Sequence, residues 1–110
     1  MDPKQITTLV ENLEAEVNNG GFDQFFYNST GDNTEEAIQA LEAIGASSMA
    51  EILRRAAGKF PDGMPPKDRV ARQDLLLQIS PDGHAFEDLD SQFCGYPDDL
   101  SGLLAKYVSS

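Results

Sequence analysis

The sequence predicts an all-α fold, a compact single domain of six or seven short helices over residues 1–110. Apolar residues recur every three or four positions along nearly the whole chain, which is the spacing of one helix face. No segment alternates apolar and polar residues for long enough to form a convincing strand. Clusters of glycine, proline and asparagine separate the helical stretches, and no linker or internal repeat divides the chain.

The first predicted helix begins at Asp2, which forms a capping-box pattern with Gln5 and precedes a proline at the first helical position. An apolar stripe follows at helical spacing: Ile6, Leu9, Val10, Leu13 and Val17. Residues 18–21 are two asparagines and two glycines, which are typical of a helix end because both tolerate left-handed backbone. Three phenylalanines then predict a short second helix: Phe22, Phe25 and Phe26.

The third helix follows a polar turn and is expected to be capped by Asp32 or Asn33. Its inward residues are Ile38, Leu41 and Ile44, and Gly45 is expected to end it. Ser48 and Glu51 form a second capping-box pattern, which predicts the start of the fourth helix. The buried face of that helix is expected to consist of Met49, Ile52, Leu53, Ala56 and Phe60.

The segment FPDGMPP interrupts the helical pattern, and a fifth helix is predicted from about residue 67 to 78. Two apolar residues of this helix repeat at a spacing of seven, Val70 and Leu77. A second Pro-Asp-Gly turn follows and places His84 in solvent. Another helical stripe contains Phe86, Leu89, Phe93 and Tyr96. Pro97 or Asp98 is expected to open the last helix, which closes onto the core through Leu100, Leu103, Leu104 and Tyr107.

The charge balance is the most unusual property of the composition, since 19 Asp and Glu oppose 8 Lys and Arg. Residues 1–53 carry ten acids and one base, and residues 73–110 carry seven acids and one base. Residues 54–72 carry six bases and two acids. These six bases are expected to form ion pairs that tie acidic helices together, in preference to a separate anion site: Arg54, Arg55, Lys59, Lys67, Arg69 and Arg72.

The acidity serves either solubility or a surface that meets a basic partner. Direct binding to nucleic acid is disfavoured in both cases, because phosphates would be repelled at long range. No apolar run approaches the roughly 18 residues of a membrane helix, and the acidic, amphipathic N-terminus does not resemble a signal peptide. The single cysteine, Cys94, excludes an intrachain disulfide and fits a reducing compartment, so a cytoplasmic location is expected.

Signatures of catalysis and of cofactor binding are missing from the sequence. His84 and Cys94 lie ten residues apart without the spacing of a known nucleophile pair, and Cys94 is expected to be a small buried hydrophobe. The segment FEDLDSQF lacks the glycine and the ligand spacing of a calcium loop, and no His or Cys cluster suggests another metal. Residues 20–21 lack the lysine and the preceding strand of a phosphate loop. We therefore expect no catalytic residue, metal or cofactor.

Acids three or four positions apart on a helix lie about 5–6 Å from each other. Several such rows on adjacent helices can present a lattice of carboxylates, as the phosphates of duplex DNA do. One candidate patch for binding a partner consists of Glu11, Glu14, Asp32, Glu35, Glu36 and Glu42. A second consists of Glu87, Asp88, Asp90, Asp98 and Asp99. The same acids can instead be solvated helix faces and partners of helix dipoles.

The segment EVNNGGFDQFFYNSTGD, residues 16–32, is the most distinctive stretch of the chain. Together with EEAIQALEAIGA, FPDGMPPKDRVAR, FEDLDSQF and DDLSGLLAKY, it resembles the bacterial DNA-mimic-protein family over about residues 16–107. The resemblance implies an all-α fold. For the characterised kind of member it also implies an acidic surface that imitates DNA and binds a transcription regulator. The family shares no known catalytic residues that could be carried over.

The first functional hypothesis is a non-enzymatic DNA mimic that occupies the DNA-binding site of a basic protein, with a monomer favoured over a homodimer. Its target would be a transcription regulator, a nucleoid protein, or a restriction or CRISPR effector, which reads a short duplex motif through Lys and Arg. The alternative is a helical adaptor or immunity-type protein whose acidity only serves solubility. An exposed apolar groove near residues 22–27 would favour this alternative. An enzyme would require a pocket that joins His84, Cys94 or several carboxylates.

Overall fold

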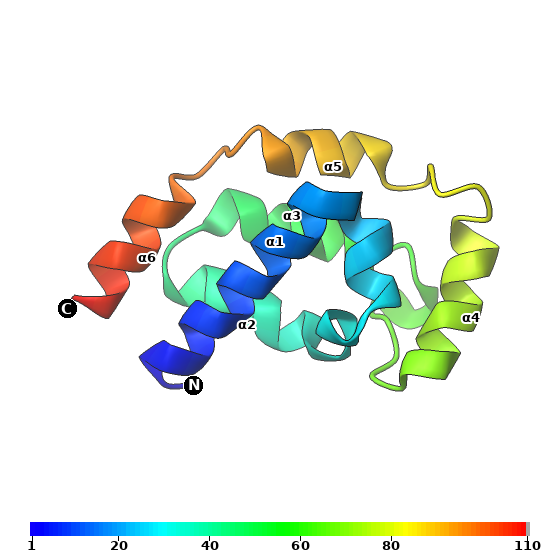
Figure 1. The fold of residues 1–110 in the computed structure, drawn as a ribbon, viewed down its shortest axis with the longest axis horizontal. Coiled ribbons are helices and arrows are strands. Elements are labelled where there is room, and N and C mark those ends of the chain that lie inside the picture. Colours follow the sequence, from blue (N-terminus) through cyan, green and yellow to red (C-terminus); the bar gives the residue numbers. More distant parts are fainter. Residues whose placement is uncertain (110) are drawn as a thin grey trace.

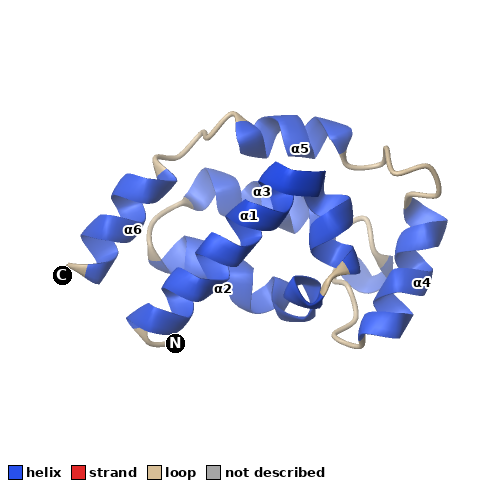
Figure 2. Cartoon of the chain, in the orientation of Figure 1, coloured by secondary structure: helices blue, strands red, loops and turns tan. Residues whose placement is uncertain are grey.

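The chain folds into six α-helices and two short 3₁₀ helices in a computed structural model that describes residues 1–109. In chain order these elements are α1 (Pro3–Tyr27), η1 (Ser29–Asn33), α2 (Thr34–Ala43), α3 (Ser47–Ala57), η2 (Pro61–Gly63), α4 (Arg69–Ile79), α5 (Glu87–Cys94) and α6 (Leu100–Val108). No strand occurs among the described residues, so the predicted all-α class is confirmed (Figure 2). None of these helices is long and apolar enough to cross a membrane.

Helix α1 is the central element of the fold and contacts η1, α2, α4, α5 and α6 (Figure 1). Helices α2 and α3 pack against each other, and α5 lies across α1 and α3. Helices α4 and α6 lie at opposite ends of the long axis of a molecule measuring 42 × 26 × 23 Å. Two of the most acidic helices, α1 and α5, are therefore direct neighbours.

A kink divides α1 into two arms at Gly20 and Gly21. Gly21 has a φ of 71°, in the left-handed region that favours glycine. Residues 18–21 were predicted to end one helix and the phenylalanines to begin another. The structure confirms this as a kink between two arms of one helix. The capping box of Asp2 and Gln5 is confirmed, and the second arm starts where Asp90 accepts a hydrogen bond from the Phe22 N–H at 2.8 Å.

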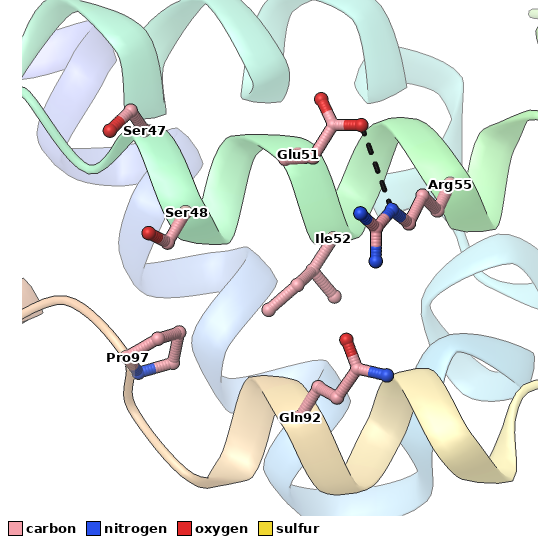
Figure 3. A pocket seen from close by; sticks show the side chains of 7 residues that line it. All are labelled: Ser47, Ser48, Glu51, Ile52, Arg55, Gln92 and Pro97. Carbon is pink, nitrogen blue, oxygen red and sulfur yellow. Dashed lines mark ion pairs between the residues drawn. The ribbon is translucent and has the colours of Figure 1, made fainter.

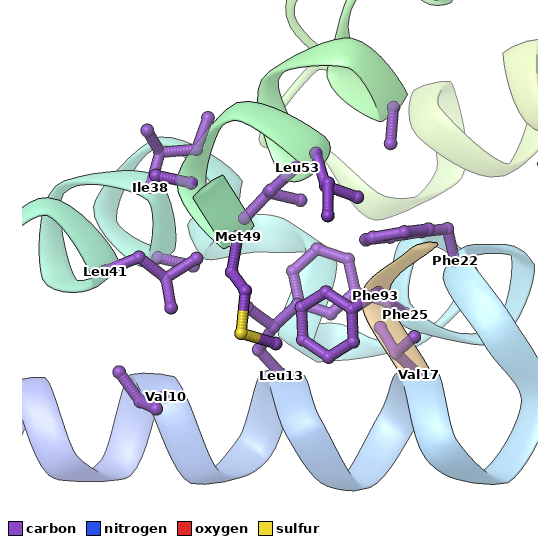
Figure 4. Packing of buried hydrophobic residues seen from close by; sticks show 14 of the residues in the cluster. Val10, Leu13, Val17, Phe22, Phe25, Ile38, Leu41, Met49, Leu53 and Phe93 are labelled. Carbon is purple, nitrogen blue, oxygen red and sulfur yellow. The ribbon is translucent and has the colours of Figure 1, made fainter. Parts of the chain in front are cut away.

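The core is built around the phenylalanines, and all six in the chain are buried. Phe26 is central, with its ring centroid 4.9 Å from that of Phe60 and 5.4 Å from that of Phe86. Met49 of α3 points toward Leu13 of α1 (Figure 4). The inward faces predicted for the first four helices are buried, except that Leu9 is only partly so.

Helix α4 differs most from the prediction, because it begins two residues later, at Arg69, and turns another face inward. Val70 and Leu77, which repeat at a spacing of seven, are 66% and 64% exposed. The buried residues of the helix are Arg72 and Leu76. The spacing of seven therefore marks the outer side of α4, since a buried arginine occupies the inner side.

The predicted cap position of α2 is confirmed at Asn33, whereas the predicted starts of α3 and α6 are wrong. Helix α2 follows Asn33, which makes no side-chain cap. Helix α3 begins at Ser47, and its Met49 N–H is bound at 2.8 Å by Asp98 in place of the predicted Ser48 box. Helix α6 opens after Asp99, one residue beyond the predicted start at Pro97 or Asp98.

One prediction near the C-terminus also needs correction. Cys94 is exposed rather than buried, and its Sγ lies 3.4 Å from the side-chain oxygen of Asn18. The reason is that Phe93 takes the inward position at the end of α5. The predicted closure of α6 onto the core is confirmed, since Leu100 is buried and three partly buried residues pack against the core: Leu103, Leu104 and Tyr107.

Candidate partner-binding surface

The cations of residues 54–72 lie beside acids of η1, α2 and α3. Arg54 of α3 pairs with Glu42 of α2, and Lys67 reaches Glu36 of α2 at 2.8 Å. Further pairs are Arg54–Glu51, Arg55–Glu51, Arg69–Asp32 and Arg72–Asp32. The predicted role of these cations in tying acidic helices together is confirmed for four of the six: Arg54, Lys67, Arg69 and Arg72. Arg55 pairs only with Glu51 of its own helix, and no ion pair of Lys59 occurs among residues 1–109.

Arg72 is fully buried and holds the chain around the end of α1. Its Nε donates to the Phe26 carbonyl at 2.6 Å, and its Nη2 donates to the Asn28 carbonyl at 3.0 Å. Nη2 also donates to Asp32 at 2.7 Å, while Nη1 donates to the carbonyls of Pro66 and Lys67. The hydrogen bond and the charge of Arg72 lower the pKa of Asp32 despite partial desolvation, with Arg69 adding to the effect. Asp32 therefore has a structural role.

The acids of α1 and α5 have a different environment, because no ion pair within residues 1–109 joins either helix to a Lys or Arg. The side chains of Glu11 in α1 and Asp88 in α5 are exposed and make no hydrogen bond or ion pair in the described chain. Glu14, one turn after Glu11, accepts a hydrogen bond from the Tyr96 hydroxyl at 2.7 Å. Glu14 therefore lies where α1 meets the end of α5.

Four acids and one histidine gather beside the kink of α1, and we call them the acidic corner: Asp23, Asp82, His84, Glu87 and Asp90. Desolvation raises the pKa of Asp90, and the charges of Asp23 and Glu87 raise it further, against the hydrogen bond from Phe22. Desolvation likewise raises the pKa of Asp23, although a hydrogen bond with Ser80 opposes it. The corner therefore concentrates negative charge around two partly desolvated carboxyl groups, those of Asp23 and Asp90.

His84 is exposed, as predicted, and its Nδ1 pairs with Glu87. The hydrogen bond and charge of Glu87 raise the pKa of His84, and Asp82 adds to this. Asp23 and Asp82 were not among the acids predicted from sequence. Only the kink at Gly21 and the turn before α5 bring them together, so no spacing in the sequence could have identified them.

The remaining predicted acids do not form continuous rows. Asp98 and Asp99 cap α3 and α6 through the N–H groups of Met49 and Gly102. Glu36 lines a groove against the first arm of α1, whereas Glu35 and Glu42 line a separate hollow beside Arg54. The first predicted patch is thus divided among α1, η1 and two sides of α2, and the second keeps only Glu87, Asp88 and Asp90 on one helix.

The groove between α3 and α5 has a volume of about 490 Å³ and is lined by Ser47, Ser48, Glu51, Ile52, Arg55, Gln92 and Pro97 (Figure 3). Its one ion pair, Glu51–Arg55, lies along a single helix. Neither His84 nor Cys94 lines it. Among the described residues, no group of three or more His, Cys, Asp or Glu side chains is arranged to hold a metal ion.

Comparison with protein families matches residues 2–110 to the model described as "DMP19-like protein". Comparisons with curated proteins and with solved structures find no match. The family match spans nearly the whole chain and includes every helix described above. The chain therefore belongs to the DMP19-like protein family, the DNA-mimic family that its sequence resembles.

Proposed function

We propose that this protein is a non-enzymatic DNA mimic that occupies the positively charged DNA-binding site of another protein in the bacterial cytoplasm. Membership of a DNA-mimic family supports this role. The fitting targets are a transcription regulator or a defence effector such as a restriction or CRISPR complex. Each of these reads duplex DNA through Lys and Arg side chains, which an acidic surface can bind.

The separation of charge within the molecule is the observation that carries the proposal. Five of the six cations of residues 54–72 pair with acids of η1, α2 and α3. The acids of the neighbouring helices α1 and α5 have no such partner among residues 1–109. We therefore assign the main contact with the partner to four acids of these two helices: Glu11, Glu14, Glu87 and Asp88.

The other predicted acids have supporting roles in this proposal. Glu35 is exposed on α2 and makes no ion pair in the described chain, so it extends the acidic surface. The remaining six are held by cations or by helix N-termini and contribute mainly to the long-range field: Asp32, Glu36, Glu42, Asp90, Asp98 and Asp99. That field speeds encounter with a basic site and weakens as salt is added.

The test begins with proteins captured from a bacterial lysate, which are then challenged with duplex DNA and with added salt. A DNA mimic must be displaced by both, because DNA and the mimic compete for the same cations. With the purified partner, the double variant Glu11→Gln/Asp88→Gln should bind about tenfold more weakly. The matched control is Glu42→Gln, whose carboxylate is already paired with Arg54, and it should bind nearly as tightly as wild type. A dominant partner that does not bind nucleic acid, or that ignores both treatments, would contradict the proposal.

An adaptor with mixed apolar contacts is the second candidate function, because one observation favours it. A groove lies between the second arm of α1 and α4. It includes residues of the segment 22–27, where an exposed apolar groove was expected to favour an adaptor. Tyr27 and Leu77 form part of its walls and are exposed. A pure adaptor differs from a mimic in the same assay, since its complex would withstand both duplex DNA and salt.

A further inference from the structure

The outer side of α4 carries an apolar strip that the core does not use. Val70 and Leu77 are 66% and 64% exposed, and Gln73 lies between them on the same face of the helix. The Gln73 side chain donates to the Tyr27 carbonyl at 2.8 Å, which places the end of α1 against this row. Tyr27 is itself 55% exposed. We call Tyr27, Val70 and Leu77 the apolar strip.

A groove of about 290 Å³ runs beside the strip and is lined by Asp23, Gln24, Tyr27, Gln73, Leu76, Leu77 and Ser80. Leu76 is buried and forms an apolar base, while Tyr27 and Leu77 are exposed at its edges. Exposed apolar residues that occur singly need no explanation. Here Tyr27 and Leu77 line one groove, and Val70 lies one turn from Gln73 of its wall, so together they mark a surface suited to contact with another molecule.

The surroundings of the strip are acidic, which identifies the charge of the occupant. Asp23 lies in the groove wall and is also part of the acidic corner with Asp82 and Asp90. Asp74 is exposed on α4, one turn from both Val70 and Leu77. The cation nearest in sequence, Arg69, is paired with Asp32 of η1. An occupant with apolar side chains in the groove and cations beside it would complement this surface.

We propose that the apolar strip and its groove bind a basic amphipathic helix on the protein that this DNA mimic inhibits. The apolar side chains of that helix enter the groove, and its Lys or Arg side chains contact Asp23 and Asp74. This inference rests on the proposed function. It adds an explanation of how the protein would select one basic partner among many. Negative charge attracts many basic proteins, whereas an apolar contact beside the charge distinguishes the one whose shape fits.

A second copy of the chain is a poorer occupant of the same strip. Two α4 helices could pair antiparallel, with Val70 of each copy against Leu77 of the other. The same pairing would bring together two copies of Asp23 and Asp74 on chains that each carry a net charge of −11. Like charges placed together oppose association, so charge favours a basic partner over self-association.

The experiment titrates the isotope-labelled protein with three helical peptides and follows its backbone amides by NMR. The first peptide has a leucine stripe flanked by lysines, the second replaces the leucines by serine, and the third replaces the lysines by glutamate. We expect only the first to shift the amides of Tyr27, Gln73 and Leu77. The double variant Val70→Ser/Leu77→Ser should bind it at least tenfold more weakly, because each change removes a large exposed aliphatic contact.

The matched control is Val108→Ser, which removes an equally apolar side chain, 53% exposed, from the distant helix α6. It should leave the affinity unchanged. Equal binding of the serine peptide, or of the glutamate peptide, overturns the proposal. The absence of amide shifts along the strip also overturns the proposal. A wild-type protein that is dimeric in solution, together with a Val70→Ser/Leu77→Ser variant that is monomeric, overturns it as well.

The two proposals can fail separately when both variants are measured against the partner that duplex DNA displaces. If Glu11→Gln/Asp88→Gln weakens the complex but Val70→Ser/Leu77→Ser does not, the strip is wrong and DNA mimicry stands. If the strip variant weakens a complex that neither DNA nor salt affects, DNA mimicry is wrong and the strip belongs to an adaptor.

Discussion

The guanidinium of Arg72, which has no exposed surface, donates to the carboxylate of Asp32 at 2.7 Å across the junction of α4 and η1. The same guanidinium donates to four backbone carbonyls, those of Phe26, Asn28, Pro66 and Lys67. A buried charge is tolerated only when it is paired and hydrogen-bonded, and Arg72 meets both conditions. One side chain thus joins α4 to the end of α1 and to η1.

We expect Arg72→Met to lower the free energy of unfolding by about 3–5 kcal/mol, because it removes hydrogen bonds to four carbonyls and leaves Asp32 with only the longer contact to Arg69. Urea denaturation measures the change. The control is Arg69→Met, which removes an exposed cation from the same carboxylate and should cost less than about 1 kcal/mol. Similar losses in the two variants would contradict the structural role of Arg72.

The pH dependence of stability should show two windows that meet at the ordinary aspartate pKa of 3.8. The pKa of Asp90 is raised in the folded state, so the folded protein takes up a proton at a higher pH than the unfolded chain does. The free energy of unfolding should therefore increase as pH falls from neutral toward 3.8. The pKa of Asp32 is lowered, so its stabilisation is present above 3.8 and is lost as pH falls below that value.

Asp90→Asn and Asp32→Asn separate these windows when denaturation is repeated over a series of pH values. The difference in free energy of unfolding between wild type and Asp90→Asn should vary with pH above 3.8. The corresponding difference for Asp32→Asn should vary with pH below 3.8. A difference for Asp90→Asn that stays constant above 3.8 would show that burial does not alter the titration of this carboxyl group.

Asp98 should matter for stability through its bond to the Met49 N–H. We expect Asp98→Ala to cost about 1 kcal/mol, as the loss of a helix cap usually does, while Asp98→Asn keeps an acceptor and costs less. Asp88→Ala is the control, because the Asp88 side chain is exposed and makes no hydrogen bond in the described chain. Thermal denaturation compares the three, and equal midpoints for Asp98→Ala and Asp88→Ala would rule out the cap.

Gly21→Ala should be more damaging than Gly63→Ala, although both glycines have positive φ angles, 71° and 79°. Left-handed backbone costs each alanine about 1–2 kcal/mol. A Cβ at Gly21 would also lie 2.4 Å from Oδ2 of Asp90, whereas one at Gly63 would meet nothing within 4 Å. Gly21→Ala should therefore displace the carboxylate that binds the Phe22 N–H and cost about 1–3 kcal/mol more. Equal costs would show that the Asp90 side chain moves aside freely.

The parts of the fold that sequence predicted are those decided by neighbours in the chain. The capping box at Asp2 involves residues three positions apart, and the phenylalanines at positions 22, 25 and 26 share a helix face. Gly45, with a φ of 85°, ends α2 as predicted, because the local backbone conformation requires it.

The parts that sequence could not predict depend on distant partners. Asp98 caps a helix that begins about fifty positions earlier, so the local pattern at Ser48 predicted the wrong cap. Arg72 resembles any surface arginine until the carbonyls of residues 26–28 are brought around it. The candidate site shares this limit, since acids that look equivalent in the sequence differ in whether a cation or an N–H group already holds them.

The placement of the cations also makes the molecule an electric dipole. Arg54, Arg55 and Lys67 lie with α2 and α3, while the unpaired carboxylates of Glu11 and Asp88 lie on α1 and α5. In the field of a basic protein, such a molecule experiences a torque before contact as well as an attraction. Rotation during approach would then present α1 and α5 first, so a larger share of collisions would begin in a productive orientation.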